Sequence, residues 1–266
     1  VGCPLREGCT GFELTADLDF DTNGNGEIDN GDDYRNITPE GVAEGWLPIG
    51  RFPDSIYVDD FSAHFNGNGH VIKNLSINRP LESSIGLFNS AENSIIENVV
   101  IAGLHSEIIG NREVAALVGH TYLNNRIRNV FIAANVHGEH FVGGLVGSAS
   151  QDFHIEKILV SGSVTGVTSA GGLVGYAGGS NSNENYINQV LSTAFVSGRA
   201  QTYFALNGAA PDTDVINSYW AKDASGQFGS YARSEANSVV GLNLVTLQCA
   251  MTENTDSATG CVSVDG

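Results

Sequence analysis

The chain has 266 residues with 33 Gly and only 6 Pro, and its 30 acidic and 12 basic residues give a formal charge of −18. Such an acidic surface repels nucleic acids and anionic membranes, and no stretch approaches the ~20 apolar residues of a membrane span. A composition rich in Gly, Asn, Val and Ile, without any capped amphipathic helix, indicates an all-β protein of many short strands and tight turns.

The first 80 residues predict a set of N-terminal coils. Residues 10–20 alternate apolar and polar side chains, which predicts one half-buried strand. Its apolar positions are Phe12, Leu14, Ala16, Leu18 and Phe20. An acidic loop at 21–45 follows, then a short apolar strand at 46–50 and two alternating segments at 61–65 and 70–77.

The acidic segment 21–32 has the spacing of the calcium loops of EF-hand and dockerin proteins. Oxygen-bearing side chains occupy loop positions 1, 3, 5, 9 and 12, and Gly26 at position 6 suits the sharp turn. The residue at position 7 is expected to bind through its backbone carbonyl, and Ile28 at position 8 to anchor the loop to the core. The predicted Ca²⁺ ligands are Asp21, Asn23, Asn25, Glu27, Asp29 and Asp32.

Position 12 of this loop departs from the EF-hand pattern. Asp32 replaces the usual Glu, as in dockerins, and Asp33 is an alternative ligand. No flanking helices are evident, so the loop is expected on a strand edge with a structural role for the ion. The competing interpretation is an acidic surface loop whose spacing arose by chance.

Five copies of a short motif dominate residues 81–220. Their central residues are 30, 28, 28 and 33 positions apart: Leu87, Leu117, Leu145, Leu173 and Leu206. A second motif follows each copy in step, at 96–99, 127–130, 155–158, 187–190 and 215–218. A unit of this length cannot bury its own apolar face, so it must stack on its neighbours as a solenoid.

The unit at 143–172 predicts the shape of one coil. A short strand at 145–146 is followed by a loop at 148–153, a strand over 155–160 and a third strand over 162–166. Three strands and three turns describe one coil of a right-handed parallel β-helix with ~28–32-residue coils, whose equivalent Leu residues stack ~4.8 Å apart. Two coils per repeat is the alternative, but it leaves too little chain for three strands.

The pattern is lost after residue 220. Residues 221–266 predict an irregular end segment, with one apolar stretch at 238–249, that covers the last coil. We therefore expect a single elongated domain over 1–266, made of N-terminal coils (1–80), repeats (81–220) and this end segment.

Four cysteines lie in two close pairs near the ends of the sequence: Cys3, Cys9, Cys249 and Cys261. The spacing is not that of a zinc site, and no His cluster accompanies it. Three disulfide connectivities exist, and pairing within each close pair needs no long-range assumption. Disulfides at these positions predict an oxidising compartment.

The units at 143–147 and 171–175, each followed by an Ile-x-Asn/Lys-x strand, resemble GLUG repeats. The resemblance covers roughly residues 10–220 and departs from the consensus at 115–116 and 203–205. It implies a scaffold of a large exported bacterial protein, such as an adhesin-like protein or the non-catalytic region of an IgA-specific metallopeptidase. Peptidase activity is not implied, because 137–140 lacks the spacing of the His-Glu-x-x-His zinc motif.

Weaker candidates lie elsewhere in the coils. One phase of the repeat predicts a partial amide ladder, as opposed to ordinary turn residues: Asn74, Asn98, Asn129 and Asn217. Two groups combine carboxylates with a His, which suits acid/base work on a glycan but equally an exposed loop: Asp59, Asp60 and His64, and Asp152 with His154. Several aromatic residues suit either sugar stacking or the core: Trp46, Trp220, Tyr176, Tyr186 and Tyr219.

These features favour a Ca²⁺-stabilised structural or adhesive module of a bacterial surface or secreted protein, not an enzyme. Its exposed coil ends predict assembly end to end into fibres. The alternatives are a polysaccharide lyase or hydrolase, which fold analogy alone suggests, and a glycan- or protein-binding module that uses loops 105–113, 148–154 and 178–185. Because the chain starts at Val1 without an apolar leader, we expect a mature or excised piece of a longer protein.

Overall fold

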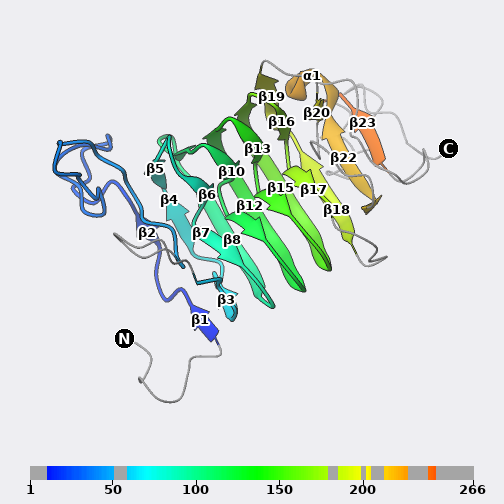
Figure 1. Cartoon of the computed structure of the whole chain (residues 1–266), viewed down its shortest axis with the longest axis horizontal. Helices are drawn as coiled ribbons and strands as arrows, with labels where there is room; N and C mark the ends of the chain where they lie inside the picture. Colours follow the sequence, from blue (N-terminus) through cyan, green and yellow to red (C-terminus); the bar gives the residue numbers. More distant parts are fainter. Residues whose placement is uncertain are drawn as a thin grey trace, which may run out of the picture.

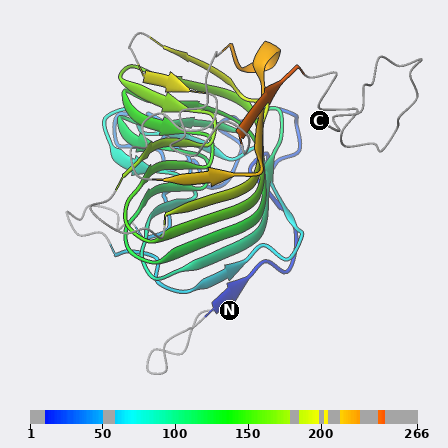
Figure 2. The same cartoon turned by 90° about the vertical axis from the view of Figure 1, so that its right-hand side faces the viewer.

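The chain forms a solenoid of stacked parallel coils. The computed structural model describes residues 11–50, 59–178, 185–198, 202–204, 213–226 and 239–243. Successive coils follow one another along the long axis in chain order (Figure 1). Seen along that axis, each coil closes around a common interior (Figure 2). The predicted parallel β-helix is therefore confirmed.

Three sheets form the faces of the solenoid, and all pairings between their strands are parallel. The main path of the long sheet comprises β1 (Gly11–Glu13), β3 (His64–Asn66), β8 (Ile95–Ala102), β12 (Asn125–His137), β15 (Phe153–Gly166), β18 (Tyr186–Ser192), β22 (Ser218–Ala221) and β23 (Val239–Leu242). Shorter strands complete it: β2 (Leu18–Asp19), β4 (Val71–Lys73), β5 (Ser76–Asn78), β9 (Glu107–Ile109), β19 (Phe195–Gly198) and β21 (Asp214–Ile216).

The other two faces are built from short strands. The second sheet contains β6 (Ser83–Ile85), β10 (Arg112–Val114), β13 (His140–Gly143), β16 (Ser169–Gly171) and β20 (Thr202–Phe204). The third sheet contains β7 (Phe88–Ala91), β11 (Val118–Thr121), β14 (Val146–Ala149) and β17 (Val174–Ala177). Within the described residues the one helix is α1 (Lys222–Ser225), and no helix is long and apolar enough to span a membrane.

Apolar side chains stack in register inside the solenoid. One internal ladder on the long sheet consists of Ile96, Ile127, Ile155, Ile187 and Val215, all fully or almost fully buried. The repeated Leu87, Leu117, Leu145 and Leu173 are buried as well. Because each coil covers the apolar face of its neighbour, the burial that a single repeat lacks is supplied by stacking.

Steric crowding requires glycine at the last position of the repeated motif. A β-carbon on Gly119, Gly147 or Gly175 would lie 2.3–2.4 Å from a backbone carbon of the second sheet in the preceding coil. The residues approached are Ser84, Glu113 and Phe141, whose φ angles are 56°, 58° and 54°. The motif therefore requires Gly because two sheets meet there with no room for a side chain.

The strand boundaries of the repeat differ from the prediction. The second and third strands expected at 155–160 and 162–166 form one 14-residue strand, β15, and the third strand of the coil is β16. The loop expected at 148–153 is shortened by β14 and β15. Gly162, with φ of 98°, lets the chain turn within β15 without breaking the ladder, which is why a turn was expected there.

The N-terminal segment also differs. The single half-buried strand expected over 10–20 is two short strands, β1 and β2, and of its five apolar positions only Phe20 is buried, whereas Phe12 is 46% exposed. Among the described strands, β1 pairs with β3 alone and β2 with β4 alone. The strand expected over 46–50 forms one isolated bridge, between Ile49 and Phe88.

Candidate functional site

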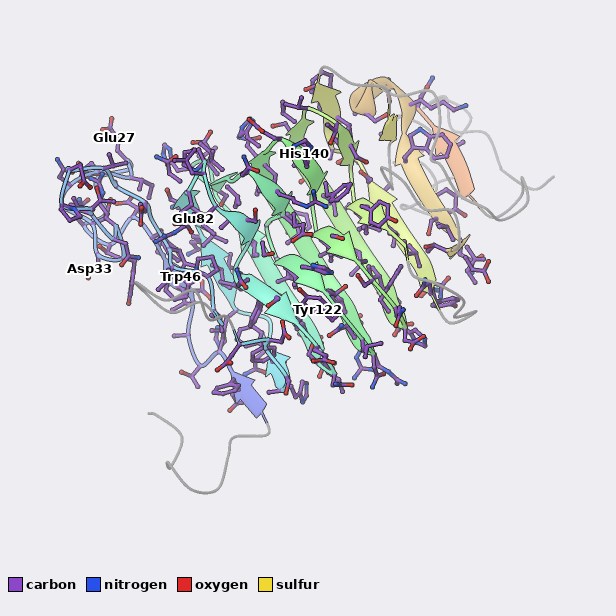
Figure 3. The ribbon with its side chains drawn as sticks, in the orientation of Figure 1. Glu27, Asp33, Trp46, Glu82, Tyr122 and His140 are labelled. Carbon is purple, nitrogen blue, oxygen red and sulfur yellow. The ribbon has the colours of Figure 1, made fainter. Side chains whose placement is uncertain are left out.

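The acidic loop 21–32 lies at one end of the solenoid, where Glu27 and Asp33 extend outward on different sides (Figure 3). Its turn is organised around Asp21, whose Oδ1 accepts the Asn25 N–H at 3.1 Å and whose Oδ2 accepts the Gly26 N–H at 2.8 Å. Gly26 has φ of 87°, which a residue with a β-carbon rarely adopts. The sharp turn predicted at loop position 6 is therefore present.

The side chains at loop positions 3, 5 and 9 converge. Asn23 and Asn25 donate their amide N–H groups to the two carboxylate oxygens of Asp29, at 3.1 Å and 2.7 Å. The pKa of Asp29 is lowered, first by the Gly31 N–H and then by the Asn25 amide. A calcium ion needs oxygen ligands, so its binding requires both amides to rotate and present oxygen instead of nitrogen.

Asp32 braces the loop. Its Oδ1 accepts the Asn23 N–H at 3.2 Å and its Oδ2 accepts the Asp29 N–H at 2.7 Å, while the residue is only 8% exposed. Burial raises the pKa of Asp32, but the N–H groups of Asp29 and Asn23 outweigh it and leave the pKa lowered. The predicted position-12 ligand is thus engaged by backbone donors from both halves of the loop.

In their present positions, the predicted ligands of loop 21–32 therefore fit a cation only in part. Within the described ranges, no group of three or more His, Cys, Asp or Glu side chains is arranged to hold a metal ion. Glu27 and the alternative ligand Asp33 are exposed. The oxygen count that calcium needs depends on the two Asn amides, whose Oδ1 atoms accept the N–H groups of Asn25 and Glu27 at 2.9 Å and 2.8 Å.

Aromatic and apolar contacts join this loop to the coils. Ile28 packs against the core, as predicted for loop position 8. The Tyr34 ring lies 5.7 Å from Phe20 and 5.9 Å from Trp46 between ring centroids. Trp46 is part of this packing and donates its indole N–H to the Leu87 carbonyl at 3.2 Å. Ordering of the loop is thereby coupled to the first repeat.

The predicted amide ladder is present in part. Asn98 donates to the Asn66 side chain at 3.0 Å, and Asn129 donates to Asn98 at 3.1 Å. Asn217 pairs instead with Asn188 at 3.0 Å, because Lys157 and Gln189 occupy the intervening coils. Asn74 belongs to a different corner, where its amide donates to Asp19 at 2.9 Å. The prediction that Asn74 shares this phase was therefore wrong.

Neither predicted carboxylate–histidine group forms an acid/base pair. His64 Nε2 lies 2.7 Å from Glu97 Oε1, and Arg128 Nε donates to the other Glu97 oxygen at 2.6 Å. Burial raises the pKa of Glu97, but these two partners outweigh it and lower the pKa overall. His154 lies with its ring against Tyr186, at 5.8 Å between centroids. These contacts connect successive coils.

A second polar network, missed by sequence reasoning, joins three coils. Glu113 Oε2 accepts the Ser84 hydroxyl at 2.8 Å and lies 3.5 Å from His120 Nδ1. His120 Nε2 lies 2.9 Å from the Ser150 hydroxyl, and the His120 ring stacks on Tyr122 at 4.1 Å. Burial and nearby carboxylates raise the pKa of Tyr122. The sequence did carry a signal for this network: Ser84 and Glu113 are one repeat apart, and so are His120 and Ser150.

Two further groups of predicted positions lie wholly or partly outside the described residues. Cys3, Cys9, Cys249 and Cys261 all lie there, so the disulfides stay a prediction. Of the three candidate binding loops, 105–113 contains β9 and part of β10, and 148–154 contains parts of β14 and β15. Most of 178–185 lies outside the described residues.

Comparisons with known proteins agree with the fold. No protein-family model matches the chain. The chain is 29% identical over 130 residues to Halomucin of Haloquadratum walsbyi. The aligned region makes up 48% of this chain but only 1% of the length of Halomucin. A crystal structure of a protein from Bacteroides ovatus, named as an immunoglobulin A1 protease candidate, superposes with a TM-score of 0.51. That likeness covers 92% of this chain and 81% of the other at 17% identity, and so it supports the β-helix fold alone.

Proposed function

We propose that this chain is a structural and adhesive module of an extracellular or surface-attached bacterial protein, stabilised by Ca²⁺ in the loop 21–32. The observation that carries the proposal is the continuous stacking of coils with fully buried internal ladders. Such a rod supplies length and a regular surface. The resemblance to GLUG repeats and the partial similarity to Halomucin support the same role.

The calcium part of the proposal rests on Asp21, Asp29 and Asp32 within one loop. The pKa values of Asp29 and Asp32 are lowered, which keeps both carboxylates ionised near neutral pH, and the two Asn amides beside Asp29 supply further oxygens once rotated. A bound ion neutralises part of the charge of residues 11–50, which carry ten acidic residues against one basic residue. The ion would have a structural role.

The assembly part of the proposal rests on the ends of the long sheet. Among the described strands, β1 pairs only with β3 and β23 only with β22. Their outer edges offer backbone groups for pairing with another copy or module. Electron microscopy and size-exclusion chromatography test this: fibres or elongated oligomers are expected, and a strict monomer at all concentrations contradicts it.

Thermal unfolding with and without calcium tests the central proposal. At 100 times Kd, a ligand that binds only the folded state adds about 2.7 kcal/mol to the free energy of unfolding. We expect the midpoint to rise by several degrees with millimolar Ca²⁺ and to return with EGTA. An unchanged midpoint would overturn the calcium claim but leave the scaffold role untouched.

A further inference from the structure

A shallow groove of about 640 Å³ crosses the outer face of the long sheet. It runs over β8, β12, β15, β18 and β22, and thus extends along the solenoid away from the end that carries the acidic loop (Figure 1). Two rows of side chains line it. The apolar row is in register across the strands and consists of Val100, Phe131, Leu159, Leu191 and Tyr219. The polar row lies at the adjacent bend and consists of Asn129, Lys157, Gln189 and Asn217.

The polar row keeps hydrogen-bonding groups free within the groove. The amide ladder that enters through Asn98 and Asn129 ends there, because the next position is Lys157. The described part of the chain offers the Lys157 ammonium group no ion-pair partner, and the side chain is exposed. Among the described residues that line the groove, Lys157 is also the single charged one. A ligand therefore meets one unpaired cation among amides.

Lys157 lies at a distance from the acidic end of the molecule. β4, which pairs with β2 near the acidic loop, is three strands from β15, about 14 Å at the usual strand spacing. The Debye length at physiological ionic strength is ~8 Å. The negative charge of the loop is thus largely screened at Lys157, and an anionic group can approach it.

The geometry favours recognition through side chains. β15 pairs with β12 on one side and β18 on the other, so its backbone groups are already used. A peptide cannot add as a further strand here, which removes its main source of affinity at a sheet. A ligand must instead match rows of amides and apolar side chains that repeat every ~4.8 Å along the axis.

We propose that this groove binds a linear polysaccharide that carries carboxylate groups, lying along the solenoid axis. Lys157 pairs with a uronate carboxylate, the amides of Gln189 and Asn217 bond to hydroxyl groups, and Phe131 and Tyr219 contact the apolar faces of sugar rings. The inference rests on the adhesive role proposed above, for which it names the ligand class. It uses no residue of the calcium loop.

Binding of polygalacturonate, measured by isothermal titration calorimetry in 50 mM and 300 mM salt, tests the inference. Unmodified protein is expected to bind it more tightly than a neutral β-glucan, and less tightly at the higher salt. The key variant is Lys157→Asn, because Asn tolerates the φ of 56° at this position and resembles its neighbours in the row. We expect it to lose about tenfold in affinity while its melting midpoint is unchanged.

Arg126→Gln is the matched control, since it removes one positive charge from an exposed position of β12 that does not line the groove. It is expected to bind polygalacturonate like the unmodified protein. No binding at millimolar sugar, or equal loss in both variants, overturns the inference. Equal competition by poly-glutamate overturns the assignment to a polysaccharide. Titrations repeated in EGTA separate this result from the calcium proposal, because the groove is expected to bind with or without the ion while the fold persists.

Discussion

Gly147 lies so close to Glu113 that a β-carbon on the glycine would stand 2.4 Å from the backbone carbonyl carbon of the glutamate. The same contact recurs one coil earlier and one coil later, at Gly119 and Gly175. At each of these glycines the third sheet therefore approaches the backbone of the second sheet with no room for a side chain. This approach, repeated along the axis, explains why the motif ends in Gly while its Leu faces the interior.

Gly147→Ala is expected to lower the free energy of unfolding by about 3 kcal/mol or more, because the new methyl group meets backbone that cannot move aside. Urea denaturation followed by circular dichroism measures this. Gly11→Ala is the control: its β-carbon would meet His64 atoms at 3.4 Å and 3.6 Å, an ordinary contact. We expect that variant to stay within about 0.5 kcal/mol of the unmodified protein. Equal losses in both variants would contradict the packing argument.

Glu113 predicts an acid-dependent loss of stability. Burial raises the pKa of this carboxyl group, but His120, Ser84 and the charge of Arg112 outweigh it and hold the pKa below its ordinary 4.5. A carboxylate with a depressed folded-state pKa stabilises the fold above the unfolded value, and its contribution disappears as the pH falls below about 4.5 and through the folded pKa.

The measurement is the free energy of unfolding between pH 7 and pH 3 for the unmodified protein and Glu113→Gln. Asp17, Asp29, Asp32 and Glu97 also have lowered pKa values and contribute to the same slope. Glu113→Gln is therefore expected to be less stable at pH 7 and to show a shallower decline on acidification. A variant with an unchanged slope would show that Glu113 is not held ionised by its partners.

The sequence predicted the solenoid well because its physical cause is periodic. The spacing of Leu87, Leu117, Leu145 and Leu173 reports burial by stacking, which recurs once per coil. The ends of strands were less predictable. Gly162 was expected to begin a separate third strand, but with φ of 98° it lets β15 continue through a turn. The backbone conformation of Gly162 depends on the neighbouring coil, so the local sequence does not predict it.

The candidate site was predictable only where contacts are local in sequence. The turn at Gly26 follows from the loop spacing, because Asp21 bonds to an amide five residues away. The network of Glu113 and His120 was missed, because its partners are contributed by adjacent coils. Asn74 was placed in the wrong row because residue type alone does not distinguish two corners of one coil: Asn74 precedes Asn98 by 24 residues, whereas Asn129 follows Asn98 by 31.

The amide ladder at Asn98 contributes two separable effects. Its side chain donates to Asn66 and accepts from Asn129, and its backbone has φ of 55°. Asn98→Gly removes the hydrogen bonds but suits the backbone, with an expected cost of about 1 kcal/mol. Asn98→Ala adds the cost of a left-handed backbone, for a total of about 2 kcal/mol. Chemical denaturation of both variants measures the difference, and an alanine variant as stable as the glycine variant would remove the backbone effect.

Asp21 and Asp33 provide the sharpest separation between a calcium loop and an acidic surface loop. Asp21 organises the turn through the N–H groups of Asn25 and Gly26, whereas the Asp33 side chain is exposed and extends outward (Figure 3). Asp21→Asn keeps an acceptor oxygen but loses the charge, so we expect it to abolish most of the rise in melting midpoint with Ca²⁺. Asp33→Asn removes the same charge outside the turn and is expected to retain that rise. Differential scanning calorimetry with Ca²⁺ and with EGTA measures both. If Asp33→Asn alone lost the response, the ion would be bound through the alternative position-12 ligand, and Asp32 would serve only as the brace between the two halves of the loop.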